Sequence, residues 1–289
     1  MRKIARPSYD SGEVFRKCVS TTRSPATREN LLSLTTQLEK IYQDYAAKAS
    51  IGNLYQIEPN FCGDNEIYLG KVSKLNLKSL YTLQMADNRK PAYEFRSKIL
   101  SAACNSRCPL CGLGHVKEID HYLPISTYPQ FSVFPSNLIP ACSQCNFAKN
   151  DISTKNKSEQ TIHPYFDDEL MEDQWLFAQI FPRSLTVEYY VNPPKHWPKE
   201  ERRRIHSHFN LFDLENRFRV ESSDLISVTC AELQSLDFES GIDSSFIRKH
   251  LEDVAQIRYK IHKNWWQTAL YQAFSTSHWF CNIGFRIWK

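Results

Sequence analysis

The sequence predicts a mainly helical protein with a small α+β insert near its middle. Residues 31–45 carry apolar side chains at spacings of three and four, the period of an amphipathic helix. Residues 105–151 change to turns and short strand-like runs that contain paired cysteines. From about residue 222 the apolar spacing is again mostly helical. Helical regions are therefore expected on both sides of the insert.

The flanking regions contain several further elements with recognisable signals. The first helix is expected over 26–48 and a second over 66–84. A third is expected from Pro91 to Cys104, because proline is favoured in the first turn of a helix. The elements expected after the insert are a strand at 184–191, a helix at 198–212, and one long helix or two joined helices over 244–274.

The charge is distributed unevenly along the chain. Residues 1–104 hold 16 Lys and Arg against 10 Asp and Glu, whereas residues 166–289 hold 15 against 18. The N-terminal region is the better candidate surface for a polyanion, and an ordinary solvated surface is an equal alternative. The N-terminus lacks the pattern of a secretory leader, and no stretch has the apolar length of a membrane span. We therefore expect a cytoplasmic protein with reduced thiols and no membrane partner.

Four of the nine cysteines form two CxxC pairs. Cys108 and Cys111 make the first pair, and Cys142 and Cys145 make the second, with 30 residues between the pairs. Two such pairs predict a structural zinc site with four thiolate ligands, and soft sulfur ligands favour zinc over a hard cation. A redox pair explains one CxxC but not two. A closed site of this kind has no open position for chemistry, so any reactive groups are expected in the 30 residues between the two pairs.

Those residues, together with Asn146 just after the second pair, contain a second constellation of polar side chains. Asp120 and His121 are adjacent in a strand-like run, Asn137 follows in a second one, and Asn146 comes directly after the last cysteine of the pairs. The expected order is strand, loop, strand and short helix. With the cysteine pairs, this arrangement resembles the zinc-stapled branch of the HNH endonucleases, which have a ββα-metal fold.

The resemblance implies a role for each matching residue in the hydrolysis of a nucleic-acid phosphodiester bond. His121 matches the general base, Asp120 and Asn146 match the ligands of a catalytic Mg²⁺ or Mn²⁺, and Asn137 matches the residue that orients the loop carrying the base. A neutral imidazole and hard oxygen ligands suit this chemistry. Lys149 is a candidate phosphate contact, with a solvent-facing lysine as the equal alternative.

One geometric condition follows from the adjacency of Asp120 and His121. Neighbouring residues in a strand point to opposite faces. Both side chains can therefore serve one site only if the strand bends or ends there, and we expect that it does.

A further resemblance extends beyond the motif. The opening stretch MRKIARPSYD and the sequence HPYFD at 163–167 resemble the HNH nuclease subunit of the Septu anti-phage defence system, including forms carried by retrons. This resemblance implies an ATPase partner that controls the nuclease, and in the retron forms a reverse transcriptase with its nucleic acid. Six aromatic residues are expected to include anchors for such a partner: Trp265, Trp266, Trp279, Phe280, Phe285 and Trp288.

The sequence predicts three regions: helical 1–104, the nuclease core 105–165, and 166–289 as a mainly helical region that docks on a partner. Two alternatives to a defence nuclease stay open. One is a non-catalytic zinc module that binds nucleic acid or protein. The other is an HNH nuclease of a restriction or mobile-element system. The sequence does not distinguish DNA from RNA as the substrate, since no base-reading or base-stacking signature is evident.

Overall fold

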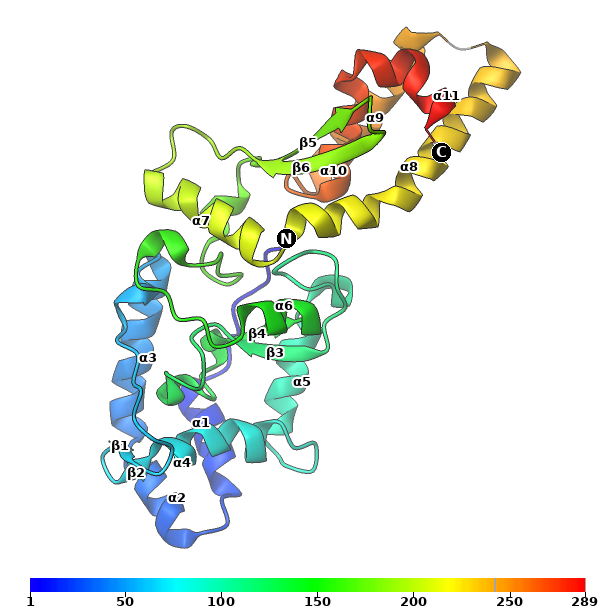
Figure 1. Ribbon diagram of the computed structural model, residues 1–289. Helices are drawn as coiled ribbons and strands as arrows, with labels where there is room; N and C mark the ends of the chain where they lie inside the picture. Colours follow the sequence, from blue (N-terminus) through cyan, green and yellow to red (C-terminus); the bar gives the residue numbers. More distant parts are fainter. Residues whose placement is uncertain (242, 289) are drawn as a thin grey trace. The chain divides into compact units, whose positions relative to one another are not determined.

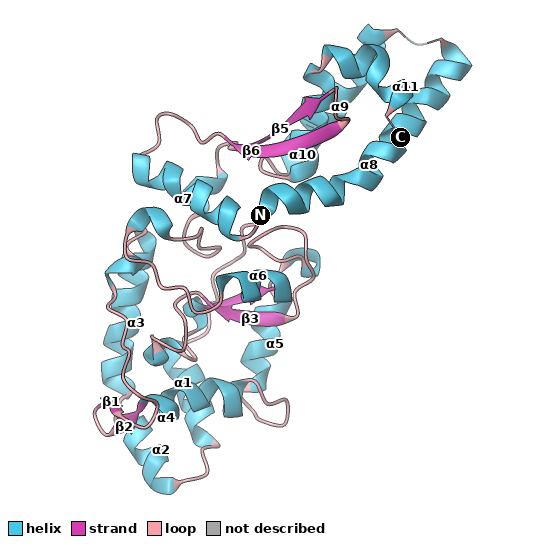
Figure 2. Cartoon of the chain, viewed as in Figure 1, coloured by secondary structure: helices cyan, strands magenta, loops and turns pink. Residues whose placement is uncertain are grey.

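The computed structural model describes residues 1–241 and 243–288. Its chain divides into two units, Met1–Asp168 and Glu169–Lys289. Both are mainly helical, and each described sheet is an antiparallel pair of strands (Figure 2). The expected fold class, helical flanks around a small α+β core, is confirmed. None of the helices in the described residues is long and apolar enough to cross a membrane.

The first unit combines its helices with two small sheets, β1–β2 and β3–β4. Its helices are α1 (Ser11–Ser20), α2 (Pro25–Leu32), α3 (Thr35–Ser50), α4 (Lys74–Ser79), α5 (Tyr93–Ser101) and α6 (Ser143–Lys149). Its strands are β1 (Ile67–Leu69), β2 (Val72–Ser73), β3 (Glu118–His121) and β4 (Leu138–Ala141). Helix α5 packs against β3 and β4, and α6 packs against β3 (Figure 1). The predicted order of strand, loop, strand and short helix is therefore confirmed for the insert.

Two of the helices predicted in the first unit are interrupted. The helix expected over 26–48 breaks between α2 and α3, where the Thr35 hydroxyl donates to the Leu32 carbonyl and competes with the helical ladder. The helix expected over 66–84 is wrong in its first part. Gly70, at φ +57°, turns β1 into β2, and α4 starts only after a capping box made by Ser73 and Asn76.

The second unit is a two-stranded sheet packed on helices. Its elements are β5 (Leu176–Phe181), β6 (Thr186–Val191), α7 (Lys199–Leu211), α8 (Leu214–Ser240), α9 (Ser244–Ile261), α10 (Trp266–Thr276) and α11 (Phe285–Ile287). The sequence predicted β6 but not its partner β5. The segment 244–274 forms two helices, and Asn264 between them accepts hydrogen bonds from the backbone of Trp175 and Leu176.

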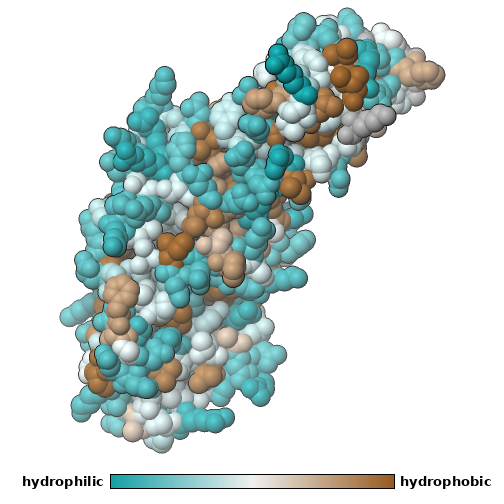
Figure 3. Space-filling model, in the orientation of Figure 1, coloured by the Kyte–Doolittle hydropathy of each residue, from teal (hydrophilic) through white to brown (hydrophobic). Residues whose placement is uncertain are grey.

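The C-terminal aromatic residues contribute to the core of the second unit. Trp266, Phe280, Phe285 and Trp288 are buried, and the rings of Phe274 and Phe280 stack 4.1 Å apart. On the face shown in Figure 3, hydrophilic side chains cover much of each unit, with hydrophobic ones scattered between them. These aromatic residues therefore stabilise their own unit, and docking on a partner remains a proposal.

Candidate functional site

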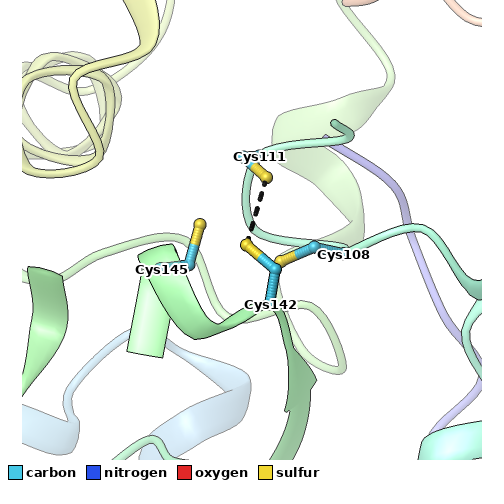
Figure 4. A group of neighbouring side chains, drawn as sticks. All are labelled: Cys108, Cys111, Cys142 and Cys145. Atoms are coloured by element: carbon cyan, nitrogen blue, oxygen red, sulfur yellow. Dashed lines mark hydrogen bonds between the residues drawn. The ribbon is translucent and has the colours of Figure 1, made fainter. Parts of the chain in front are cut away.

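The four paired cysteines converge at one end of the β3–β4 sheet. Their sulfur atoms all lie within 4.8 Å of one another, and the four residues are buried. Figure 4 shows the side chains pointing toward a common centre, two from the loop before β3 and two from the start of α6. Sulfurs about 2.3 Å from a central zinc form a tetrahedron with edges of about 3.8 Å. The Sγ atoms of Cys111 and Cys142 are 3.9 Å apart, so the cluster is spaced for a metal ion such as zinc.

Local backbone geometry shapes each CxxC turn of the cluster; we call the turn at Cys108–Cys111 the first hook and the turn at Cys142–Cys145 the second hook. Gly112, at φ +74°, donates its N–H to the Cys108 carbonyl at 2.7 Å, which closes the first hook. The N–H groups of Leu113 and Gly114 point at the sulfur of Cys111 at 3.4 and 3.5 Å. In the second hook, Cys142 is the N-cap of α6. These donors and the helix N-terminus favour thiolate sulfur, the form that binds a metal.

The close packing of the four sulfur atoms affects how readily the thiols lose their protons. Hydrogen bonding to the other sulfurs, followed by burial, raises the pKa of the Cys145 thiol far above its usual range. Four adjacent negative charges are unfavourable without a cation between them. The donor set therefore fits a soft divalent metal, which removes that penalty by binding the deprotonated sulfurs.

The sheet brings Asp120 and His121 to the edge of one pocket. In the antiparallel pair, Asp120 lies opposite Ile139 and His121 lies opposite Leu138. Strand β3 ends at His121, as the sequence prediction required. A pocket of 410 Å³ is lined by Glu118, Asp120, His121, Pro124, Ile125, Ser143, Asn146, Phe147, Asn150 and Asp151. Three of the four predicted reactive residues therefore line the same pocket.

Asp120 has one bonded and one unbonded carboxylate oxygen. Its Oδ1 accepts from the ammonium of Lys149 at 3.1 Å, and both side chains are 4% exposed. Among the described residues, no hydrogen-bond donor reaches the buried Oδ2. Burial raises the pKa of the carboxyl to about 6, although Lys149 acts in the opposite direction. A buried carboxylate oxygen without a partner is costly unless something positively charged occupies the position beside it.

Lys149 lies inside the protein. Its Nζ donates to the Asp120 carboxylate and, at 2.6 Å, to the backbone carbonyl of His121. The geometry favours a role in holding Asp120 and the end of β3 over the predicted phosphate contact, and that contact remains a prediction.

The ring of His121 is held in one tautomer. Its Nε2 lies 2.9 Å from the carbonyl oxygen of Ser132. A carbonyl only accepts, so Nε2 carries the hydrogen and Nδ1 keeps a lone pair. The pKa of the imidazole is lowered to about 4: burial is the largest cause, the hydrogen bond to the Ser132 carbonyl acts in the opposite direction, and the nearby Lys149 adds to the lowering. The ring of Tyr81 packs edge-on against it, with centroids 4.5 Å apart. The result is a neutral, oriented imidazole at the pocket.

Asn146 is oriented by Glu118, which sequence reasoning missed. The Oε2 of Glu118 lies 2.5 Å from the Asn146 Nδ2. Because a carboxylate accepts only, the amide nitrogen must face Glu118 and the amide oxygen must face away. Hydrogen bonds from Ser143 and then Asn146 lower the pKa of Glu118, so it stays ionised. The available signal was spacing: Glu118 is two residues before Asp120 and therefore on the same face of β3.

Asn137 is fully buried beneath the loop that follows β3. Its Nδ2 donates to the carbonyl of Leu123 at 3.0 Å, and its Oδ1 accepts from the N–H of the same residue at 2.8 Å. The hydroxyl of Tyr45 also reaches Oδ1, at 3.1 Å. The side chain therefore ties the two ends of the 123–137 loop together, the arrangement expected of a residue that orients a loop.

Comparison with known proteins gives two similarities. The chain is 29% identical over 294 residues to protein ea31 of Escherichia phage lambda, with 96% of this chain and 98% of that protein covered. It is 34% identical over 68 residues to the Septu protein PtuB of Bacillus thuringiensis, which covers 22% of this chain and 26% of PtuB. No protein-family model and no solved structure matches the chain. The chain is thus similar along its length to a phage protein and over a short part to a Septu protein.

Proposed function

We propose that the chain is a metal-dependent endonuclease of the HNH type that hydrolyses phosphodiester bonds in a nucleic acid. The observation that carries the proposal is the pocket at the end of β3. It combines an unbonded oxygen of Asp120, an amide oxygen of Asn146 turned away from Glu118, and an oriented neutral His121. Each of these groups is held by a second residue, which is typical of reactive sites.

The oxygen atoms fit a hard divalent cation. Carboxylate and amide oxygens are ligands that Mg²⁺ and Mn²⁺ accept, and both ions keep several water molecules as further ligands. A cation bound by Asp120 and Asn146 supplies positive charge where negative charge develops on the phosphate. In its absence the Lys149 ammonium offsets part of the charge of Asp120.

His121 supplies the proton acceptor. The Ser132 carbonyl fixes the hydrogen on Nε2, which leaves Nδ1 to take a proton from a water molecule in the pocket. The low pKa that burial gives the ring keeps it neutral across the physiological range. Asn137 holds the loop that contains Ser132 and so acts on the base indirectly.

The cysteine cluster has a structural role in this proposal. Four sulfur ligands complete a tetrahedral zinc site and leave no position for a water or substrate. A bound zinc would tie the loop before β3 to the start of α6, and α6 contributes Ser143 and Asn146 to the lining of the pocket. Asn146 follows Cys145 directly, so metal binding at one residue fixes the position of the next.

The test is cleavage by the purified, zinc-loaded chain. Double- and single-stranded DNA and RNA are incubated with Mg²⁺, with Mn²⁺, and without either ion. We expect divalent-dependent cleavage of at least one substrate and its loss in the His121→Ala variant. Tight binding of nucleic acid without cleavage under every condition would instead support the non-catalytic zinc module.

The two relatives favour different biological settings. The partial similarity to a Septu protein supports an anti-phage effector controlled by an ATPase subunit, alone or with a retron reverse transcriptase and its nucleic acid. The similarity to a phage protein along the whole chain supports a nuclease of a phage or other mobile element. Co-expression with the neighbouring genes and purification through a tag on this chain distinguish the two: a stable ATPase complex supports the first setting, and a monodisperse active nuclease supports the second.

A further inference from the structure

The sequence HPYFD at 163–167 lies in the core of the first unit and is not explained by the reactive pocket. His163 is 2% exposed, and its ring packs 4.1 Å from the ring of Tyr122 and 4.8 Å from that of Phe166. Its backbone N–H donates to the Asp167 carboxylate at 2.7 Å. This bond links the first and last residues of the 163–167 segment, and the rings of Tyr122 and Phe166 hold the imidazole between them.

The hydrogen bonds of His163 determine its tautomer. The backbone N–H of Tyr165 points at Nδ1 from 3.2 Å. A backbone N–H only donates, so Nδ1 accepts and the ring hydrogen lies on Nε2. Nε2 is 3.2 Å from the hydroxyl oxygen of Tyr45. His163 therefore donates to Tyr45.

The hydrogen bond from His163 determines the direction of the hydrogen bond between Tyr45 and Asn137. Its oxygen accepts from His163, which leaves the hydroxyl hydrogen to be donated to the Asn137 Oδ1 at 3.1 Å. Burial, with smaller contributions from Tyr122 and Tyr165, raises the pKa of the Tyr45 hydroxyl well above its usual value, so the donor keeps its hydrogen. The Tyr45 ring is itself held edge-on by Phe131 and Phe134, at 4.9 and 5.1 Å.

The hydrogen bonds that run from His163 through Tyr45 to Asn137 lead on to the loop that holds His121, the candidate base. With Oδ1 fixed by Tyr45 and by the Leu123 N–H, the amide nitrogen of Asn137 faces the carbonyls of Leu123 and Phe131. Ser132 follows Phe131, and its carbonyl accepts from the Nε2 of His121. A directed series of buried hydrogen bonds therefore runs from 163–167 to the loop that sets the tautomer of His121.

We infer that His163 and Tyr45 are positioning residues for His121, and that they act through Asn137 and the 123–137 loop. This inference rests on the proposed function for its catalytic consequence, but its structural consequence does not depend on catalysis. Buried networks in which every donor and acceptor is satisfied specify one arrangement, and a small displacement of a reacting group is enough to reduce the rate strongly.

The chain offers a matched pair of variants for the test. Tyr45→Phe removes the hydroxyl that reaches Asn137 and keeps the ring. Tyr42→Phe makes the same change one turn earlier on α3, at a buried ring stacked 4.3 Å from Phe134. Among the described residues, nothing hydrogen-bonds to the Tyr42 hydroxyl. Both variants lose one buried oxygen atom, and only Tyr45→Phe interrupts the series.

Two readouts are measured on the zinc-loaded full chain. Nitrogen-15 spectra of histidine-labelled protein, assigned by comparison with His121→Ala, report which ring nitrogen of His121 carries the hydrogen. We expect a single Nε2–H form in the wild type and in Tyr42→Phe, and a mixture in Tyr45→Phe. Kinetics should show a fall in kcat on the order of 10-fold or more in Tyr45→Phe, with KM and zinc content unchanged. His163→Ala should give the same spectral change, since it removes the donor to Tyr45.

The outcomes separate this inference from the proposed function. An unchanged His121 spectrum in both Tyr45→Phe and His163→Ala would overturn the inference, as would cleavage by Tyr45→Phe at the rate of Tyr42→Phe. A wild-type chain that cleaves no substrate would overturn the proposed function. The altered spectrum in Tyr45→Phe would in that case still establish the positioning series.

Discussion

The cysteine cluster and the Asp120 pocket lie on two sides of helix α6. They differ in burial, in the type of ligand atom and in the open volume beside those atoms. The cluster is buried, consists of sulfur alone and offers four equivalent ligands. The pocket has a volume of 410 Å³ and a lining of oxygen and nitrogen groups. Cys145 and Asn146 are adjacent in α6, yet about 100° of helical rotation directs one to the cluster and the other to the pocket.

The difference shows how β3, β4 and α6 together can keep a candidate stabilising site apart from a candidate reactive one. A site whose ligands are complete lowers the free energy of the folded state and does nothing further. The pocket groups are instead each held by a second residue: Asp120 by Lys149, His121 by Ser132 and Asn146 by Glu118. Changes in the cluster should therefore affect folding, and changes in the pocket should affect chemistry.

The largest expected effect is that of Cys142→Ser. Structural zinc contributes about 10–16 kcal/mol in small peptides, against a stability of about 5–15 kcal/mol for a whole domain. We expect zinc content to fall and the first unit to lose its cooperative melt, as measured by metal analysis and calorimetry. Cys104→Ser, at an exposed thiol, is the control and should behave as wild type. A normal melt with full zinc in Cys142→Ser would show that the paired cysteines do not share a metal.

Next in size is the effect of His121→Ala on cleavage. A positioned general base contributes about 10²–10⁴-fold to a rate, so cleavage should fall by that factor while zinc content and melting stay near wild type. Steady-state kinetics and metal analysis measure both. His115→Ala, at an exposed histidine on the loop before β3, should retain activity. Loss of zinc together with activity would make His121 a structural residue and break the comparison.

Lys149→Met should shift the cation requirement and also lower the stability of the first unit, because the buried Asp120 carboxylate and the His121 carbonyl both lose their donor. Without the ammonium, the Oδ1 of Asp120 loses its partner and the carboxylate is no longer held toward the pocket. Partners of metal ligands typically contribute 10–100-fold to metal affinity or activity, so we expect the Mn²⁺ concentration for half-maximal cleavage to rise by about that factor. The control is Lys117→Met, at an exposed lysine just before β3. An equal response in the two variants would leave Lys149 without a role at the site.

The smallest expected effect is that of Glu118→Ala, which frees the amide of Asn146 to rotate. We expect the half-maximal Mn²⁺ concentration to rise by about 10-fold, at the lower end of the range for such partners. Glu118→Gln keeps an oxygen that can accept from Nδ2 and should show a weaker effect. If Glu118→Ala weakens zinc retention instead, Glu118 belongs functionally to the cluster.

The sequence by itself determined the parts whose chemistry is local. Each CxxC pair supplies two sulfurs from one tight turn, so the two pairs predicted a four-sulfur metal site, and the fold brings all four sulfurs together. The order β3, loop, β4, α6 followed from short strand-like runs. The strand was expected to bend or end near Asp120 and His121, and β3 ends at His121. The helix expected over 66–84 was wrong because Gly70 and the Ser73 cap override an apolar spacing that suits a helix.

Only the tertiary structure decided which groups hold the pocket. Tyr45 and Asn137 are 92 positions apart, and Tyr45 and His163 are 118 apart, so no spacing rule relates them. Lys149 is a short-helix lysine that the sequence could equally place in solvent, and packing against the end of β3 buries it. The physical reason is the same in each case. A buried donor or acceptor must be paired, and the partner is chosen by where the folded chain brings a complementary group, not by its position in the sequence.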